Sequence, residues 1–222
     1  MQKKIIVTGD GSPTLYVPEL NEHYHSIHGA IQESDFVYIE RALNFSEHKN
    51  PNVFEVGFGT GLNAYLTCIE SETRKQQICF HSIELYPVEE AIWQKIGRYF
   101  ANNLNNHKLF LKIHECKWNE EVQISEYFRL MKINDDMTTY HNSFKYDIIY
   151  FDAFGPEVQS ALWSANIFVR LAGMMNPGAV LSTYSAKGLV GRNMKLAGLN
   201  IKRVPGPPGK REMIIAVKPD VI

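Results

Sequence analysis

Cysteine is scarce in this sequence: the 222 residues contain only Cys68, Cys79 and Cys116, and no two of them form a C-x-x-C pair. This count and spacing support neither a disulfide framework nor a cysteine zinc knuckle, and they predict reduced, mostly buried thiols. Apolar runs are short, such as residues 148–151, so we expect no membrane-spanning helix. The apolar stretch at residues 5–7 is too short for a signal peptide, which makes a cytoplasmic protein the default expectation.

A strong net charge is missing as well, because 23 basic and 24 acidic residues leave the chain at −1. The charge is unevenly spread, since residues 187–222 carry eight basic and two acidic side chains and residues 1–186 are therefore at −7. A basic C-terminal part is a weak indication of a polyanionic partner, and a solvated surface is the alternative. The sequence does have 45% hydrophobic and 12% aromatic residues, enough for the core of one large domain.

Short β-type runs and helical patterns can be placed along the chain by their periodicity. Residues 5–8 and 14–17 flank Gly9-Asp10-Gly11-Ser12, which is typical of a β-hairpin, and a helical pattern around residues 36–43 follows. From residue 52 onwards, strands and helices alternate. We expect strands at 53–56, 78–83, 109–113, 146–151, 179–184, 201–204 and 212–217, and helices at 62–72, 87–100, 121–132, 158–169 and 186–197.

This alternation predicts an α/β fold with a Rossmann-like, mostly parallel sheet of seven strands that helices cover on both faces. The link between the last two strands, residues 205–211, is too short for a parallel crossover, so these strands should pair antiparallel. The sheet should therefore have one reversed strand near an edge. We divide the chain into an N-terminal β-hairpin and helix extension that covers the active site, residues 1–45, and a core, residues 46–222.

Three expected strand ends carry residues with a chemical role, and ligands bind at the carboxyl ends of strands in open α/β sheets. In residues 55–63 (EVGFGTGLN), glycines recur at every second position and allow a tight turn close to a ligand. Glu84 ends the next strand, where it can accept hydrogen bonds from a ribose diol. Asp152-Ala153-Phe154-Gly155-Pro156 follows a later strand. Together they predict a nucleoside site, and the spacing G-x-G-x-G suits a cationic or zwitterionic ligand better than a pyrophosphate.

At these residues the chain resembles the class I S-adenosylmethionine-dependent methyltransferases over residues 52–217. The resemblance implies that S-adenosyl-L-methionine is the cofactor. The methionine end would lie on the glycine-rich loop and Glu84 would bind the ribose hydroxyls. Lys117 and Trp118 fall where the family contacts adenine, although the acidic residue common there is absent. The implied cofactor-binding residues are Glu55, Gly57, Phe58, Gly59, Gly61, Asn63, Glu84, Lys117 and Trp118.

A narrower resemblance covers nearly the whole chain. The motifs at residues 8–12, 22–26, 29–30, 55–63 and 152–156 and the closing KREM at 210–213 are similar to those of the bacterial transfer-RNA wobble-uridine methyltransferases. This family makes 5-methylaminomethyl-2-thiouridine from the 5-aminomethyl precursor, which implies that the partner is the tRNA anticodon loop. The family domain occurs alone or fused to a flavin-dependent oxidase. The chain is too short to include that oxidase, so the resemblance implies the stand-alone form, with any oxidase on a separate chain.

The resemblance also implies roles at the substrate. Asp152 would be the catalytic carboxylate that holds the amine, whereas a helix N-cap is its structural alternative. Whether it also takes the proton is open. Phe154 would stack on a splayed base or pack in the core, and Tyr24 and His25 would roof the pocket. Phosphate contacts would come from Lys187, Arg192, Lys210 and Arg211.

Other interpretations of the sequence remain open at this stage. His23, His25 and His28 could in principle bind a metal, but methyl transfer needs none and we expect no metal cofactor. A polyamine aminopropyltransferase would share the fold, yet its paired D-x-x-D is incomplete here because Gly155 stands three residues after Asp152. A non-catalytic RNA-binding module, or a methyltransferase acting on a small molecule or a protein, are further alternatives.

Overall fold

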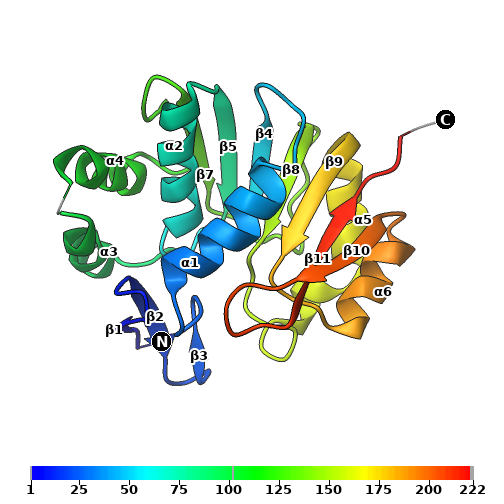
Figure 1. Ribbon diagram of the computed structural model, residues 1–222, viewed down its shortest axis with the longest axis horizontal. Coiled ribbons are helices and arrows are strands. Elements are labelled where there is room, and N and C mark those ends of the chain that lie inside the picture. The colour runs from blue at the N-terminus through cyan, green and yellow to red at the C-terminus, as the bar shows by residue number, and fades with distance from the viewer. Residues whose placement is uncertain (1, 102, 221–222) are drawn as a thin grey trace.

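The structure is a computed structural model that describes residues 2–101 and 103–220. Its centre is a mixed sheet of eight strands between two layers of helices (Figure 1). Four neighbouring strands run parallel, and they are, in spatial order, β8 (Tyr146–Phe151), β4 (Asn52–Val56), β5 (Ile78–Ile83) and β7 (Phe128–Ile133). β9 (Met175–Thr183) extends the parallel part beside β8, and β6 (Glu121–Gln123) closes the other edge antiparallel to β7.

The last two strands have the predicted arrangement. β11 (Glu212–Val217) pairs antiparallel with β9, and β10 (Asn200–Pro205) pairs antiparallel with β11 at the edge. The expectation of a mostly parallel sheet with one reversed strand near this edge is confirmed. The sheet has eight strands rather than seven, because the short β6 was not predicted and adds a second reversed strand at the opposite edge.

Each face of the sheet is covered by its own helices, as expected for parallel strands that are apolar on both sides. One apolar layer packs the sheet against the helices of the first two-thirds of the chain, and the other packs it against the later helices. The first layer contains α1 (Ala30–Ser34), its π-helical continuation (Asp35–Leu43), α2 (Leu62–Arg74), α3 (Glu90–Gly97) and α4 (Leu104–Glu115). The second contains α5 (Ala165–Met174) and α6 (Gly188–Leu196).

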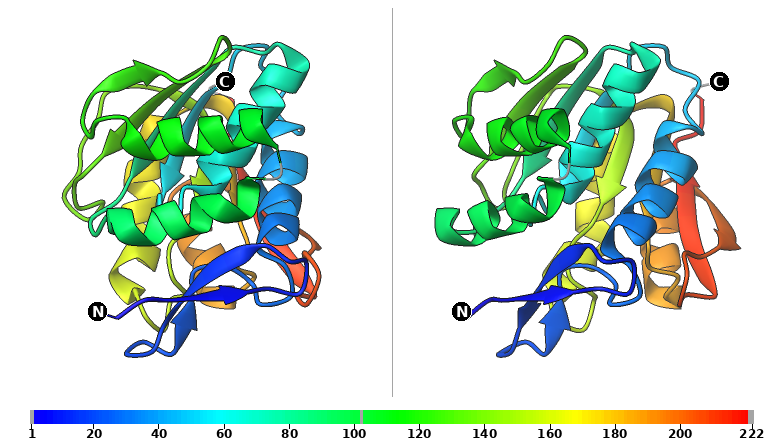
Figure 2. Two further views of the ribbon diagram at one scale, coloured as in Figure 1. Left: turned by 90° about the vertical axis from the view of Figure 1, so that its left-hand side faces the viewer. Right: turned by 60° about the vertical axis from the view of Figure 1, so that its left-hand side comes forward.

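The N-terminal residues form a separate small sheet of β1 (Lys4–Val7), β2 (Pro13–Val17) and β3 (Glu22–His23). The β1–β2 hairpin has the predicted turn, in which Asp10 Oδ1 accepts a hydrogen bond from the backbone N of Ser12 at 3.0 Å. Figures 1 and 2 show this sheet below α1, at the end of the molecule toward which the parallel strands point. The π-helix beyond α1 packs on β8 and β9, so only the first part of the extension stands apart from the core.

Two expected elements have the wrong type, and a third is displaced, because the helix expected at 158–169 is the 3-10 turn Ser160–Trp163 followed by α5, which begins at Ala165. Residues 109–113 belong to helix α4 and not to a strand, because Asn103 caps the helix through hydrogen bonds from the backbone N of Asn105 and Asn106, and Phe110 and Ile113 face the core three residues apart. Residues 121–132 form strands β6 and β7 and not a helix. In β7 the residues at 128, 130 and 132 are buried, the two-residue period of a strand.

The remaining expectations concern the cysteines and the membrane. All three cysteines are free thiols; Cys68 and Cys79 are buried and Cys116 is half-buried, as predicted. Within the described ranges, the helices are all too short or too polar to cross a lipid bilayer.

Candidate active site

A cavity of about 680 Å³ opens at the carboxyl ends of four neighbouring parallel strands, within the size range of ligand pockets. Its walls come from the ends of β4, β5, β7 and β8, and the N-terminal sheet covers it from outside. Of the residues predicted for the site, those that line this cavity are Gly57, Phe58, Gly59, Glu84, Asp152, Phe154, Tyr24 and His25.

The glycine-rich loop brings the ends of β4 and β8 into close contact. Gly57 has a φ of 95°, and a Cβ added there would lie 2.6 Å from the carbonyl oxygen of Asp152. Only a glycine combines this conformation with this approach. The loop is fixed on both sides, because the backbone N of Gly57 donates to Ile83 O and that of Asp152 donates to Val56 O, each at 3.0 Å.

Glu84 ends β5 at the wall of the cavity. Its Oε2 accepts a hydrogen bond from the backbone N of Gly59 at 3.1 Å, and its Oε1 accepts one from the backbone N of Tyr86 at 2.9 Å. Burial raises the pKa of this carboxyl above its ordinary value, and the two backbone hydrogen bonds oppose that shift. Each oxygen keeps a free lone pair, so the carboxylate can still accept from a bound hydroxyl.

Asp152 follows β8 and presents its carboxylate to the same cavity. Its Oδ2 accepts a hydrogen bond from Asn63 Nδ2 at 2.7 Å. The hydroxyl of Tyr38, in the π-helix, donates to the neighbouring Phe151 O at 3.3 Å. Burial raises the pKa of Asp152 to about 6, and the nearby Tyr38 hydroxyl and the Asn63 amide partly offset the shift. This carboxylate is therefore a stronger base than an exposed aspartate, and the hydrogen bond from Asn63 sets its orientation.

Glu55 lies behind the cavity and not in it. Its side chain is fully buried, and Ser82 Oγ donates to its Oε2. Burial raises the pKa of Glu55 well above its ordinary value, although hydrogen bonds from Ser82 and Asn63 oppose the shift. Glu55 Oε1 and Asn63 Oδ1 are buried without another partner among the described residues. A protonated Glu55 would satisfy both by donation to Asn63 Oδ1, an arrangement that also directs Asn63 Nδ2 at Asp152.

Aromatic side chains from two distant segments form the roof. The rings of Tyr24, after β3, and Phe154, after β8, meet edge to face with centroids 4.9 Å apart. His25 beside them is neutral, because burial lowers its pKa to about 4. The three predicted histidines do not converge: His25 Nδ1 lies 3.1 Å from Thr14 Oγ1, and His23 stacks on Tyr16 with centroids 4.7 Å apart.

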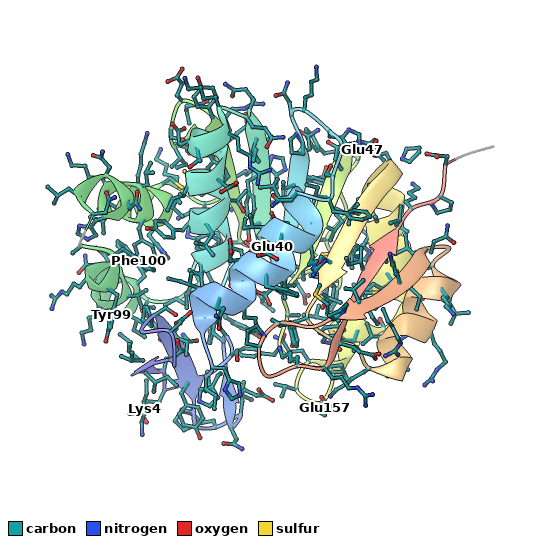
Figure 3. The ribbon with its side chains drawn as sticks, viewed as in Figure 1. Lys4, Glu40, Glu47, Tyr99, Phe100 and Glu157 are labelled. Carbon is teal, nitrogen blue, oxygen red and sulfur yellow. The ribbon has the colours of Figure 1, made fainter. Side chains whose placement is uncertain are left out.

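The predicted basic residues lie outside the cavity, and two of them are already paired. Lys187 forms an ion pair with Glu157, which Figure 3 places at the same lower edge of the molecule as the N-terminal sheet. Lys210 pairs with Glu33 and lies 3.9 Å from the ring centre of Tyr184. Arg192 and Arg211 are exposed, and neither forms an ion pair within the part of the chain that the structure describes.

The reason for placing Lys117 and Trp118 at the adenine was wrong, because the segment before them is helix α4 rather than the third strand. They line a shallower hollow beside Trp93 and His114, and Trp118 packs edge to face on Phe58 with centroids 5.7 Å apart. The third parallel strand is β7, and the residues that follow it and line the cavity are Asp135, Asp136, Met137 and Thr138. The adjacent acidic residues Asp135 and Asp136 are the sequence feature that would have indicated this part of the cavity. They follow a strand only when residues 128–133 are assigned to β7.

Comparisons with known proteins agree with this geometry. Residues 87–219 match a family described as S-adenosyl-L-methionine-dependent methyltransferase. The chain is 28% identical to the tRNA 5-methylaminomethyl-2-thiouridine biosynthesis bifunctional protein MnmC of Nitrosospira multiformis over 90% of this chain and 34% of that protein. It is also 28% identical to the MnmC protein of Campylobacter jejuni over 97% of this chain and 36% of that protein. The chain thus spans about a third of the length of these relatives.

A solved structure supports the fold. The crystal structure of MNMC2 from Aquifex aeolicus superposes with a TM-score of 0.78 at 22% identity, over 100% of this chain and 72% of that one. The expected class I methyltransferase architecture is confirmed by this match together with the strand order.

Proposed function

The chain belongs to the family of S-adenosyl-L-methionine-dependent methyltransferases, and from that premise we propose that it methylates the aminomethyl nitrogen on the wobble uridine of tRNA. The observation that carries the proposal is the half-buried Asp152 carboxylate, which lines the cavity and is held there by a hydrogen bond from Asn63. The similarity of nearly the whole chain to part of the MnmC proteins supports the choice of tRNA as substrate.

The cavity fits the cofactor chemically. Glu84 offers carboxylate oxygens to the ribose diol, the backbone at Gly57 and Gly59 leaves room for the methionine part, and Asp135 and Met137 line the wall that we assign to adenine. When bound, the cofactor supplies a methyl group on a positively charged sulfur. The acidic lining of Glu84, Glu89, Asp135, Asp136 and Asp152, with Lys3 as its one cation among the described lining residues, suits a cationic ligand.

Asp152 would prepare the attacking amine. An alkylamine has an ordinary pKa of about 10.4 and is mostly protonated at neutral pH. The Asp152 carboxylate accepts a hydrogen bond from the nitrogen, orients its lone pair toward the methyl carbon and stabilises the cation formed on transfer. With a pKa of about 6, the same carboxylate is also suited to accept the proton. Gly155 leaves no second acid where an aminopropyltransferase would have one, so that alternative is not favoured.

The tRNA would approach from the side of the N-terminal sheet. Tyr24 and Phe154 offer aromatic faces to a base turned out of a single-stranded loop. The loop between β10 and β11 carries Lys210 and Arg211 at the same end of the sheet, where they could contact phosphates. We place the reaction in the cytoplasm.

The proposal is tested by methyl transfer into tRNA from cells that lack this protein. We expect labelled methyl from the cofactor to appear in the tRNA, and nucleoside mass spectrometry to show 5-methylaminomethyl-2-thiouridine replacing its 5-aminomethyl precursor. Transfer RNA from cells that contain the protein is the matched control and should accept little label. Labelling of total protein or of polyamines with none in tRNA would refute the substrate, whereas RNA binding without turnover would favour the non-catalytic module.

Arg192 and Arg211 are the exposed basic residues that we expect to contact phosphates. Replacing both by alanine should raise the KM for tRNA about tenfold, and should lower the slope of log affinity against log salt by about 1.5, since each lost phosphate contact removes about 0.7–0.9. Lys108→Ala with Lys195→Ala is the control, because both lysines are exposed and Lys195 lies in the last turn of α6. An equal slope change in the two double variants would contradict a specific RNA-facing role.

A further inference from the structure

A buried polar cluster that methyl transfer does not use lies on the α5–α6 face of the sheet. Cys79 and His81 in β5 are only 4% and 3% exposed. Strands covered on both sides normally carry apolar residues, and burial of polar groups is unfavourable unless they have partners. The cover here is the segment 134–145, whose Phe144 ring lies 5.0 Å from that of His81.

Glu121 from the edge strand β6 completes a triangle of metal-binding atoms. Cys79 Sγ lies 3.4 Å from His81 Nε2 and 3.4 Å from Glu121 Oε2, and His81 Nε2 lies 3.6 Å from Glu121 Oε2. In a tetrahedral zinc site with ordinary bond lengths, neighbouring sulfur, nitrogen and oxygen ligands are about 3.4–3.6 Å apart. The triangle therefore has the dimensions of one face of a zinc coordination tetrahedron.

The atoms of these residues that do not face the triangle have partners of their own. His81 Nδ1 lies 2.7 Å from the hydroxyl of Tyr146, which also accepts a hydrogen bond from Asn142 Nδ2 at 2.9 Å. Donation from Nδ1 to Tyr146 leaves the lone pair of Nε2 directed at the triangle, the arrangement typical of metal-bound histidines. On the other side Arg129 Nη1 donates to Glu121 Oε1 at 3.1 Å and leaves Oε2 available.

We propose that Cys79, His81 and Glu121 bind one zinc ion, with a fourth position open to water beside Glu121. A thiolate, an imidazole and a carboxylate form a donor set that favours Zn²⁺ over Mg²⁺ or Ca²⁺. The Glu121 side chain is 41% exposed, which gives the ion a route of entry. The site lies on the face of the sheet and shares no residue with the cofactor cavity, so it is separate from the methyl-transfer site.

The position suggests a structural role for the ion. β6 has only three residues and pairs only with β7 in the described part of the sheet. A metal bound to Glu121 and to the two β5 residues would link the short edge strand β6 to β5, across β7, which lies between them. Short, exposed edge strands are the parts of a sheet that open most easily, so occupancy should stabilise this region most.

The experiment uses the full chain after treatment with a chelator. Titration with Zn²⁺ in competition with a chromophoric chelator should give one ion per chain with micromolar affinity or tighter. Co²⁺ should give a thiolate-to-metal charge-transfer band and the intense visible bands of a tetrahedral complex. At a free Zn²⁺ concentration one hundred times the Kd, the Tm should rise by about 5–10 °C.

Variants decide which residues hold the ion. Glu121→Gln changes a surface side chain and should fold normally, yet it should weaken Zn²⁺ binding at least tenfold and reduce the Tm rise at the same free Zn²⁺ concentration by half or more. Cys79→Ser should remove the charge-transfer band, whereas Cys116→Ser should keep it, because Cys116 Sγ instead donates to Ile113 O at 3.2 Å. A wild-type Co²⁺ complex without a thiolate band, or unchanged Zn²⁺ affinity in both Glu121→Gln and Cys79→Ser, would overturn the proposal.

Discussion

Asp152→Asn should lower kcat for methyl transfer by about 10²–10⁴-fold while the affinity for S-adenosyl-L-methionine changes less than about threefold. The amide has nearly the same shape and can still accept the hydrogen bond from Asn63 that now reaches Oδ2 at 2.7 Å. It cannot take a proton or balance the charge of the methylated amine. Single-turnover rates and calorimetric titration of the cofactor would separate the two effects. A kcat within tenfold of wild type would remove Asp152 from the chemistry.

The pH dependence gives an independent test of the same carboxylate. The pKa of Asp152 is raised to about 6 by burial, and an ordinary aspartate has a value of 3.8. If the ionised form is required, the kcat/KM of the wild type should fall tenfold per pH unit below about pH 6. The residual activity of Asp152→Asn should lack this acidic limb. An identical limb in both proteins would assign it to another group.

The same substitution should stabilise the protein. Because the raised pKa belongs to the folded state, the folded protein binds the proton more tightly than the unfolded chain. Ionisation therefore costs stability as pH rises from 3.8 through about 6 and the cost is complete above that range. Asparagine avoids it, which should add roughly 2–3 kcal/mol above pH 7, or about 5–10 °C in Tm. The gain should disappear near pH 4. Asp220 is an exposed carboxylate, and as a control Asp220→Asn should leave the Tm unchanged both above pH 7 and near pH 4.

Strand and helix periodicity predicted most of the core correctly, and its failures have a local cause. Residues 109–113 (LFLKI) are apolar at four of five positions, a run that fits a buried strand or one face of a helix equally well. The cap that decides for the helix is Asn103, six residues earlier. Because of this error, Lys117 and Trp118, rather than residues 135–138, were placed after the third strand, where we expect the adenine to bind.

The site was predictable to the extent that topology alone determines it. Glu84 and Asp152 end parallel strands that flank β4, so their meeting at one cavity follows from strand order. The pairing of Asn63 with Asp152 does not, because it joins a helix and a strand end 89 residues apart. Glu55 illustrates the same limit: its place in the loop predicts a cofactor ligand, whereas its burial against Ser82 makes it a support behind Asn63.

Gly57→Ala should disrupt both the fold and the cofactor site. The added methyl would lie 2.6 Å from the carbonyl oxygen of Asp152 at a φ of 95°. Neither backbone segment can yield without moving the Asp152 carboxylate, because Asp152 N donates to Val56 O and Gly57 N donates to Ile83 O. We expect a loss of about 3–5 kcal/mol, seen as a Tm lower by about 10–15 °C. Cofactor affinity should fall at least tenfold.

Gly198→Ala separates the close approach from the backbone strain. Gly198 also has a positive φ, 80°, but no atom of the described residues lies within 4 Å of the position that a Cβ would take there. Alanine at this position should cost about 1 kcal/mol, a Tm change of about 2–4 °C, and leave cofactor affinity unchanged. Equal losses in the two variants would mean that strain alone explains the effect at Gly57. A larger loss at Gly57, with weaker cofactor binding, would show that the contact between the β4 and β8 ends holds the glycine-rich loop and the Asp152 carboxylate in one arrangement.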